Sequence, residues 1–184
     1  MSSNIALYGM MGVGKSTVGR MLAGRLGRGF ADTDDEITRW QARSIPDIFA
    51  EEGEPGFRAY ESTVVRELAT YHDLVLALGG GAILSDANVA DLTLTSVLVH
   101  LHCDVDVLVE RLRAEADHRP LISGDDVERR VRDTWAARAD RYREIADLTV
   151  DAAEEPQAVV EAIVEWLLEH QDVLTPSEYE AVMR

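Results

Sequence analysis

Residues 9–17 read Gly-Met-Met-Gly-Val-Gly-Lys-Ser-Thr, and this stretch decides the fold class. Its spacing, Gly-x4-Gly-Lys-Ser, is the P-loop pattern, in which backbone N–H groups surround phosphate oxygens. Lys15 is the only lysine among the 18 lysine and arginine residues of the chain. A compact ammonium therefore stands where a phosphate is expected, while planar guanidinium groups serve elsewhere. The pattern predicts that Lys15 reaches the β- and γ-phosphates of a nucleotide and that Ser16 binds magnesium.

The sequence on either side of the loop supplies the structural context that the motif requires. Residues 5–8 form a short apolar run typical of a buried strand. After the loop, Val18, Leu22 and Leu26 recur at helical spacing, and Gly27 then ends the helix. A helix that begins in the loop directs its N-terminus at phosphate oxygens. We therefore prefer nucleotide binding to the alternative, a glycine turn that carries a surface lysine.

Apolar runs and glycine breaks predict an α/β fold. The predicted strands are residues 4–8, 29–32, 73–78, 96–102 and 147–151. Helical patterns separate these runs, which favours a parallel sheet covered on both faces. We predict a three-layer α/β/α P-loop kinase fold with a central five-stranded parallel sheet and a mobile lid at about residues 114–126. Residues 1–170 are expected to form one domain, followed by a polar, partly frayed tail at residues 171–184.

Composition limits the partners of this chain. Its 184 residues carry a formal net charge of −16, which disfavours binding to nucleic acid or to an anionic membrane. No apolar run is long enough to span a bilayer, and a strand that begins at residue 4 leaves no room for a signal peptide. The single cysteine, Cys103, has no internal disulfide partner. We expect a cytoplasmic protein and a monomer.

Polar and glycine-rich segments follow the second and third predicted strands. Asp32 and Asp34 are two residues apart on extended backbone, so both carboxylates can face one site, one near magnesium and one accepting a hydroxyl proton. The alternative is an acidic N-cap for the next helix. Residues 79–81 are three glycines, which let the backbone approach a ligand closely. The alternative is a flexible turn.

Several arginine and histidine residues remain open to two interpretations. Arg58 and Glu61 share a helix face, where they form either part of a site or a surface ion pair. Arg119 lies in the predicted lid, where it either reaches a transferring phosphate or is solvated. Arg138 lies on a charged helix, most of whose arginines must face solvent. His100, His102 and Cys103 lack the usual zinc spacing, and we assign them a structural role.

Together these motifs resemble those of the shikimate kinases, small P-loop enzymes with the nucleoside-monophosphate-kinase-like fold. The resemblance covers nearly the whole chain, from Ile5 to about Leu168. Besides the P-loop, it is carried by Asp32-Thr33-Asp34, residues 45–54, Phe57-Arg58-x-x-Glu61, Gly79-Gly80-Gly81-Ala82, Arg119-Pro120-Leu121 and Arg138-x-x-x-Tyr142. Many proteins share a P-loop alone, so the ordered set carries the specificity.

The resemblance implies ATP-dependent phosphorylation of the 3-hydroxyl of shikimate, with ATP and Mg²⁺ as cofactors, in aromatic amino acid biosynthesis. It implies that the phosphates of ATP are bound by Gly12, Val13, Gly14, Lys15, Ser16 and Thr17, with Arg119 covering them from the lid. Ser16 and Asp32 are implied at the magnesium ion. Arg111 and Pro156 match positions that flank adenine.

The resemblance also implies the acceptor site. Asp34 holds the ring hydroxyls and is the implied base, so the implied catalytic group is Asp34, Lys15 and Arg119. Arg58 and Arg138 clamp the shikimate carboxylate, and Gly79, Gly80 and Gly81 close the pocket. Forked guanidinium groups suit a carboxylate, and aspartate suits hydroxyl donors, so the residue chemistry agrees with this assignment.

Two rival functions stay open at this point. The first is a sibling kinase that acts on gluconate or on a nucleoside monophosphate; the set of Asp34, Arg58, Gly80 and Arg138 argues against it. The second is a regulatory nucleotide-binding module without turnover. Such a module is expected to lack the base or the phosphate-binding lysine, whereas this chain has both Asp34 and Lys15.

Overall fold

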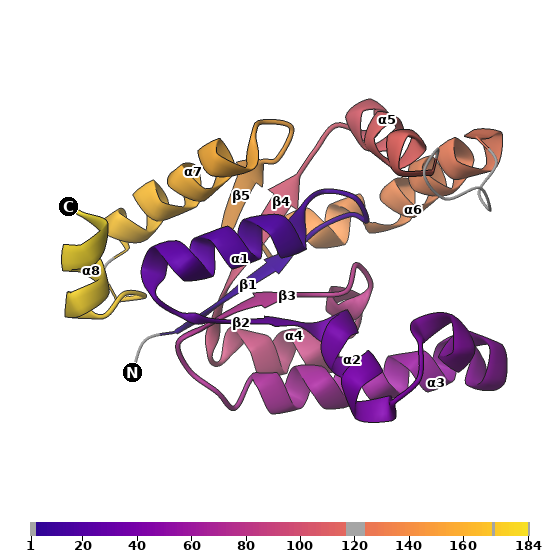
Figure 1. The fold of residues 1–184 in the computed structure, drawn as a ribbon, viewed down its shortest axis with the longest axis horizontal. Helices are drawn as coiled ribbons and strands as arrows, with labels where there is room; N and C mark the ends of the chain where they lie inside the picture. The colour runs from indigo at the N-terminus through magenta and orange to yellow at the C-terminus, as the bar shows by residue number, and fades with distance from the viewer. Residues whose placement is uncertain (1–2, 117–123, 171, 184) are drawn as a thin grey trace.

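A single parallel sheet forms the centre of the molecule (Figure 1). The computed structural model describes residues 3–116, 124–170 and 172–183, and in this part of the chain five strands pair in the order β2-β3-β1-β4-β5. The strands are β1 (Asn4–Tyr8), β2 (Gly29–Asp32), β3 (Leu74–Ala77), β4 (Ser96–His102) and β5 (Leu148–Asp151). All neighbouring pairs are parallel, which confirms the predicted fold class.

Helices cover both faces of this sheet. They are α1 (Lys15–Leu26), α2 (Thr33–Gln41), α3 (Ile45–Leu68), the 3₁₀ turn η1 (Ala82–Leu84), α4 (Asp86–Thr93), α5 (Val105–Ala116), α6 (Gly124–Glu144), α7 (Pro156–Glu169) and α8 (Pro176–Val182). Helix α1 packs on the sheet with α7 and α8 beside it, whereas α4 packs on β4 together with α3 (Figure 1). Among the described residues, no helix combines the length and the apolar character that crossing a membrane requires.

The central strand shows why the sheet is apolar on both sides. All five residues of β1 are buried, as a parallel strand between two helical layers must be. Leu7 points to α1, close to Gly19, and Tyr8 points the other way, to His100 of β4 and Tyr142 of α6. The carboxyl ends of β1, β2 and β3 therefore open at one edge, where the chain continues into the P-loop, Asp32 and the triple-glycine turn.

Helix α3 contains a kink that divides it into two halves. Ser44 caps its N-terminus by accepting a hydrogen bond from the Asp47 N–H. Gly53 then leaves the helical conformation with φ of 69°, two residues before Pro55. The kink lets Arg58 and Glu61, in the second half of the helix, approach the carboxyl ends of the strands.

The C-terminal tail is more ordered than the sequence suggested. Residues 176–182 form α8, which Thr175 and Glu178 cap reciprocally, and Val182 is buried. Arg28 ties the tail to the body by contacts to the Val173 carbonyl and the Glu178 carboxylate. The expectation of a frayed tail is therefore wrong for the described part of residues 172–183. The polar sequence did not indicate this helix, because the tail is held by Arg28, which is distant in the sequence.

His100 and His102 pack against aromatic side chains of neighbouring elements. His100 is 1% exposed and stacks on Tyr8 with a centroid distance of 5.4 Å. His102 packs on Trp135, and Cys103 is buried. Within the described ranges, no three His, Cys, Asp or Glu side chains gather as a metal-binding group. Burial, followed by repulsion from His102 and Arg143, lowers the pKa of His100 to about 4.

Acid should therefore destabilise the protein through His100. The unfolded chain takes up a proton near the ordinary pKa of 6.5, whereas the folded chain does so only near 4, so folding stability falls as pH drops through this window. We expect His100 to contribute a loss of about 2 kcal/mol between neutral pH and pH 5. Urea unfolding of the wild type and of His100→Phe, at neutral pH and at pH 5, measures this loss of stability. Exposed His72→Gln is the control, and equal acid sensitivity in wild type and His100→Phe would contradict the assignment.

Candidate active site

A cavity of about 580 Å³ lies at the carboxyl ends of the central strands. Its lining comes from the P-loop, from the end of β2, from α3, from the triple-glycine turn, and from α5 and α6. The lining residues are Met10, Met11, Gly12, Lys15, Ser16, Asp32, Asp34, Phe57, Arg58, Glu61, Leu78, Gly79, Gly80, Gly81, Leu112, Arg130, Val131, Thr134 and Arg138. Cationic and anionic side chains thus share a space large enough for small polar molecules.

The P-loop places its lysine at the start of α1. Gly14 forms the N-cap with φ of 100°, a left-handed conformation that glycine adopts readily. The Lys15 Nζ donates to the carbonyl oxygens of Gly9 at 3.2 Å and Met10 at 3.0 Å. Burial lowers the pKa of Lys15 to about 8, although the carboxylates of Asp34 and Asp32 oppose this change. The ammonium is thus held at the loop by groups that a phosphate can replace.

Nucleotide affinity should decline in alkaline solution because of this lysine. Bound phosphate oxygens favour the charged ammonium, whereas the free protein loses the proton near pH 8. The Kd for ATP should therefore rise with pH above about 8, approaching tenfold per pH unit. Isothermal titration between about pH 7.5 and 9.5 measures this slope. Lys15→Met should bind ATP more weakly and lose the slope; a wild-type Kd that stays flat over this range would contradict the role of Lys15.

Ser16 and Asp32 form a pair of hard oxygen donors beside Lys15. The Ser16 Oγ donates to Asp32 Oδ2 at 2.6 Å, and Asp32 Oδ1 accepts from the Asp34 N–H at 3.0 Å. Asp32 is therefore the N-cap of α2 and also lines the cavity. One carboxylate, one hydroxyl, phosphate oxygens and water are the ligands that Mg²⁺ prefers. The residues present fit a magnesium ion.

Two carboxyl groups, each with one buried oxygen, lie against the glycine turn. Asp34 Oδ1 and Glu61 Oε1 are buried and have no hydrogen-bond partner within the described residues. A Cβ built on Gly79 would lie 2.7 Å from that Glu61 oxygen and 2.9 Å from that Asp34 oxygen, so only glycine fits between them. Burial raises the pKa of both groups, and the Asp32 carboxylate raises that of Asp34 further. Asp34 is consequently a stronger base than an exposed aspartate.

Arg58 is held beside the turn by acidic partners on its own helix. Its Nη1 donates to Glu61 Oε2 at 2.7 Å, and its Nη2 donates to Glu54 Oε1 at 3.1 Å. Glu61 is buried, so the contact that the sequence left open as a surface pair is partly buried. A Cβ on Gly81 would lie 2.4 Å from the Arg58 Nη1, which shows how closely the turn approaches the guanidinium.

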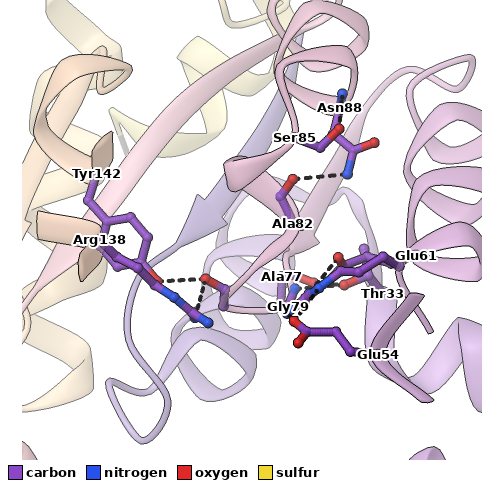
Figure 2. A network of polar contacts seen from close by, with 12 residues as sticks. Thr33, Glu54, Glu61, Ala77, Gly79, Ala82, Ser85, Asn88, Arg138 and Tyr142 are labelled. Carbon is purple, nitrogen blue, oxygen red and sulfur yellow. Dashed lines mark hydrogen bonds and ion pairs between the residues drawn. The ribbon is translucent and has the colours of Figure 1, made fainter. Parts of the chain in front are cut away.

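Four side chains from other elements hold the triple-glycine turn and the alanine that follows it (Figure 2). The Thr33 hydroxyl accepts from the Gly79 N–H at 2.8 Å. The Gly80 carbonyl accepts from Arg138 Nη1 at 3.0 Å and from the Tyr142 hydroxyl at 2.6 Å. The buried Asn88 amide donates to the Ala82 carbonyl at 2.9 Å. The turn is therefore held from both sides by hydrogen bonds to other elements.

Comparison with known proteins identifies the chain. The family profile described as shikimate kinase matches residues 11–168. The chain belongs to the shikimate kinase family.

Close relatives agree with this placement. The shikimate kinase of Pseudomonas fluorescens is 44% identical over 157 residues, which cover 85% of this chain and 91% of the relative. That of Thermosynechococcus vestitus is 41% identical over 166 residues, covering 90% of each chain. Membership in the shikimate kinase family makes this chain an ATP-using phosphotransferase of the shikimate pathway.

Solved structures separate this family from its neighbours in the same fold. The shikimate kinase of Acinetobacter baumannii in complex with shikimate superposes with a TM-score of 0.84 and is 38% identical, covering 93% of this chain and 96% of that one. A gluconokinase of Sinorhizobium meliloti reaches a TM-score of 0.58 at 17% identity, covering 92% and 97%. The second likeness shows the fold alone.

Most residues that the shikimate kinase motifs singled out lie together. The cavity is lined by Gly12, Lys15, Ser16, Asp32, Asp34, Arg58, Gly79, Gly80, Gly81 and Arg138. Val13 is buried in the core and Thr17 is exposed, and neither lines the cavity. Arg111 and Pro156 also lie away from the lining; Arg111 donates to the carbonyls of Ala152 and Ala153, in the loop that leads to Pro156. Arg119 and most of the predicted lid lie outside the described residues.

Other residues line the cavity without a prediction. Phe57 stacks on Phe49 with a centroid distance of 4.8 Å and forms an apolar wall. Arg130 and Thr134 precede Arg138 by eight and four residues on α6, so helical spacing from Arg138 was the signal that could have found them. Leu112 of α5 contributes from the side of the P-loop, and its position follows only from tertiary packing.

Proposed function

We propose that this member of the shikimate kinase family transfers the γ-phosphate of ATP to the 3-hydroxyl of shikimate in the described cavity, with Asp34 as the base. The observation that carries the proposal is the juxtaposition within one cavity of Lys15 and Ser16 with Asp34, Arg58 and Arg138. Residues suited to bind phosphate and residues suited to bind a carboxylate thus line the same cavity. Phosphoryl transfer depends mainly on such positioning and on charge stabilisation.

The residues divide into a nucleotide side and an acceptor side. Amides of residues 12–17 and the Lys15 ammonium hold the triphosphate, and Ser16 with Asp32 would hold Mg²⁺. When bound, magnesium neutralises charge that develops on the phosphate oxygens. Arg119 of the lid is proposed to add a further cation there, and Arg111 with Pro156 to flank the adenine.

On the acceptor side, Arg58 and Arg138 bind the carboxylate of shikimate. Asp34, with its pKa raised by burial, accepts the proton of the hydroxyl as that oxygen attacks the phosphorus. Amides of the glycine turn complete the pocket. The localisation in the cytoplasm and the monomeric state remain predictions.

An acceptor series tests the proposal. Purified protein with ATP and Mg²⁺ is offered shikimate, gluconate or a nucleoside monophosphate, and ADP release is followed by a coupled assay. We expect shikimate to give the highest kcat/KM by a wide margin. Equal turnover of gluconate would favour the sibling-kinase function, and ATP binding without any acceptor-dependent turnover would favour the regulatory module.

Loss of the Arg58 side chain should act on the acceptor and spare the nucleotide. Arg58→Ala removes a charged hydrogen-bond donor for a carboxylate, so we expect the KM for shikimate to rise by about 10–100-fold and the KM for ATP to change little. Steady-state kinetics with each substrate varied measures both values. Arg43→Ala is the matched control, because Arg43 also pairs with two glutamates but lies outside the cavity. An equal rise in the KM for both substrates would contradict the proposed contact between Arg58 and the acceptor carboxylate.

A further inference from the structure

The carbonyl of Gly80 has two donors that differ in their freedom to move. Arg138 reaches it at 3.0 Å with one nitrogen of a partly exposed guanidinium (Figure 2). The Tyr142 hydroxyl reaches it at 2.6 Å and is fully buried. Its ring is fixed by edge contacts with Tyr8, His100 and Trp135 at centroid distances of 5.4–6.3 Å. Tyr142 is therefore the rigid partner of this carbonyl.

The direction of that carbonyl sets the direction of a neighbouring amide. A trans peptide is planar, so the Gly81 N–H points opposite to the Gly80 carbonyl, away from Tyr142. The Gly79 N–H is already bound to Thr33. Within the described residues, the N–H groups of Gly80 and Gly81 have no acceptor, and both glycines line the cavity. Two backbone donors are therefore available on the acceptor side.

Burial of the hydroxyl keeps Tyr142 a hydrogen-bond donor. Burial raises the pKa of Tyr142, and Arg138 opposes this change without reversing it, so the phenol stays protonated in neutral solution. The neighbouring Tyr8 hydroxyl donates to the Tyr142 backbone carbonyl at 2.7 Å and not to the glycine turn.

The proposed function gives Arg138 a second partner. If Arg138 were the sole donor to the Gly80 carbonyl, its rotation toward a ligand carboxylate would leave that carbonyl unpaired, at a cost in binding. We infer, on the basis of the proposed function, that Tyr142 is a positioning residue for the acceptor: it holds the Gly80 carbonyl while Arg138 engages the carboxylate, and so fixes the direction of the Gly81 amide at the cavity wall.

Tyr142→Phe tests this inference, with Tyr8→Phe as a matched control. Both variants lose one hydroxyl from the same buried aromatic cluster, but only Tyr142 touches the glycine turn. We expect Tyr142→Phe to raise the KM for shikimate by about 5–30-fold, with a KM for ATP within about twofold of the wild type. Both variants should lower the melting temperature by similar amounts, but Tyr8→Phe should leave both KM values unchanged.

A readout without turnover separates this inference from the proposed function. In protein labelled with ¹⁵N-glycine, the amide signals of Gly80 and Gly81 should shift in Tyr142→Phe and stay in place in Tyr8→Phe, whether or not the enzyme turns over. A wild type that does not phosphorylate shikimate would refute the proposed function. Unmoved glycine signals, an unchanged KM for shikimate in Tyr142→Phe, or an equal rise in Tyr8→Phe would overturn the positioning role.

Discussion

Asp34→Asn should lower kcat by about 10²–10⁴-fold, the range that a general base contributes. The asparagine keeps the size of the side chain but accepts no proton. The expected loss is large because the native carboxyl is half-buried beside the glycine turn and burial raises its pKa, which brings its basicity nearer to neutral pH. Single-turnover kinetics with saturating ATP and shikimate isolate this effect from binding.

Stability distinguishes a lost base from a lost fold. A group whose pKa is raised by folding contributes stability below its unfolded pKa, and this contribution is lost as pH rises through the folded pKa. Above the folded pKa, the charged Asp34 carboxylate therefore destabilises the folded protein. Asp34→Asn removes this charge, so the melting temperature of the variant at pH 8 should not fall. Asp35→Asn is the control, because Asp35 pairs with Arg20 in solvent outside the cavity. A near-normal kcat in Asp34→Asn would remove Asp34 from the base role.

Arg28→Met should destabilise the folded protein by about 3–5 kcal/mol, the usual result of removing one partner of a buried ion pair. The Arg28 side chain is 1% exposed and bonds to Glu178 at 2.6 Å, to the Ser3 carbonyl at 2.6 Å and to the Val173 carbonyl at 2.9 Å. The variant leaves these acceptors without their donor. The melting temperature should fall by roughly 6–20 °C.

A surface pair provides the matched control for Arg28. Arg66 is 69% exposed and lies 3.5 Å from Asp91, so Arg66→Met should change stability by less than about 0.5 kcal/mol. Calorimetry of both variants measures the contrast. A loss in Arg28→Met no larger than in Arg66→Met would show that the tail is not anchored by this residue.

The fold was predictable because its signals are local. Each of the five strands is an apolar run ended by glycine or a polar residue, and the P-loop spacing fixes a strand before it and a helix after it. Ser44 marks a helix cap by its side-chain hydroxyl, and Gly53 marks a kink by its backbone freedom. Short-range rules therefore suffice for the strands, the helix ends and the strand–loop–helix arrangement around the P-loop.

The remaining features depend on contacts between distant residues. Arg28 meets Glu178 across 150 positions of sequence, and Tyr142 meets Gly80 across 62. Neither pairing leaves a local pattern, so the tail helix and the fixing of the glycine turn were not predicted. The proposed acceptor residues Arg58 and Arg138 were predicted from the resemblance to a family, since an arginine on a charged helix does not by itself indicate a ligand.

Nuclear magnetic resonance of the reaction mixture tests the central claim most directly. Shikimate, ATP and Mg²⁺ are incubated with the protein, and the coupling of phosphorus to ring protons locates the transferred phosphate. The account predicts one phosphorylated product, with coupling to the proton on carbon 3. Coupling to another ring carbon, or release of free phosphate with unreacted shikimate, would contradict the placement of the 3-hydroxyl between Asp34 and the P-loop.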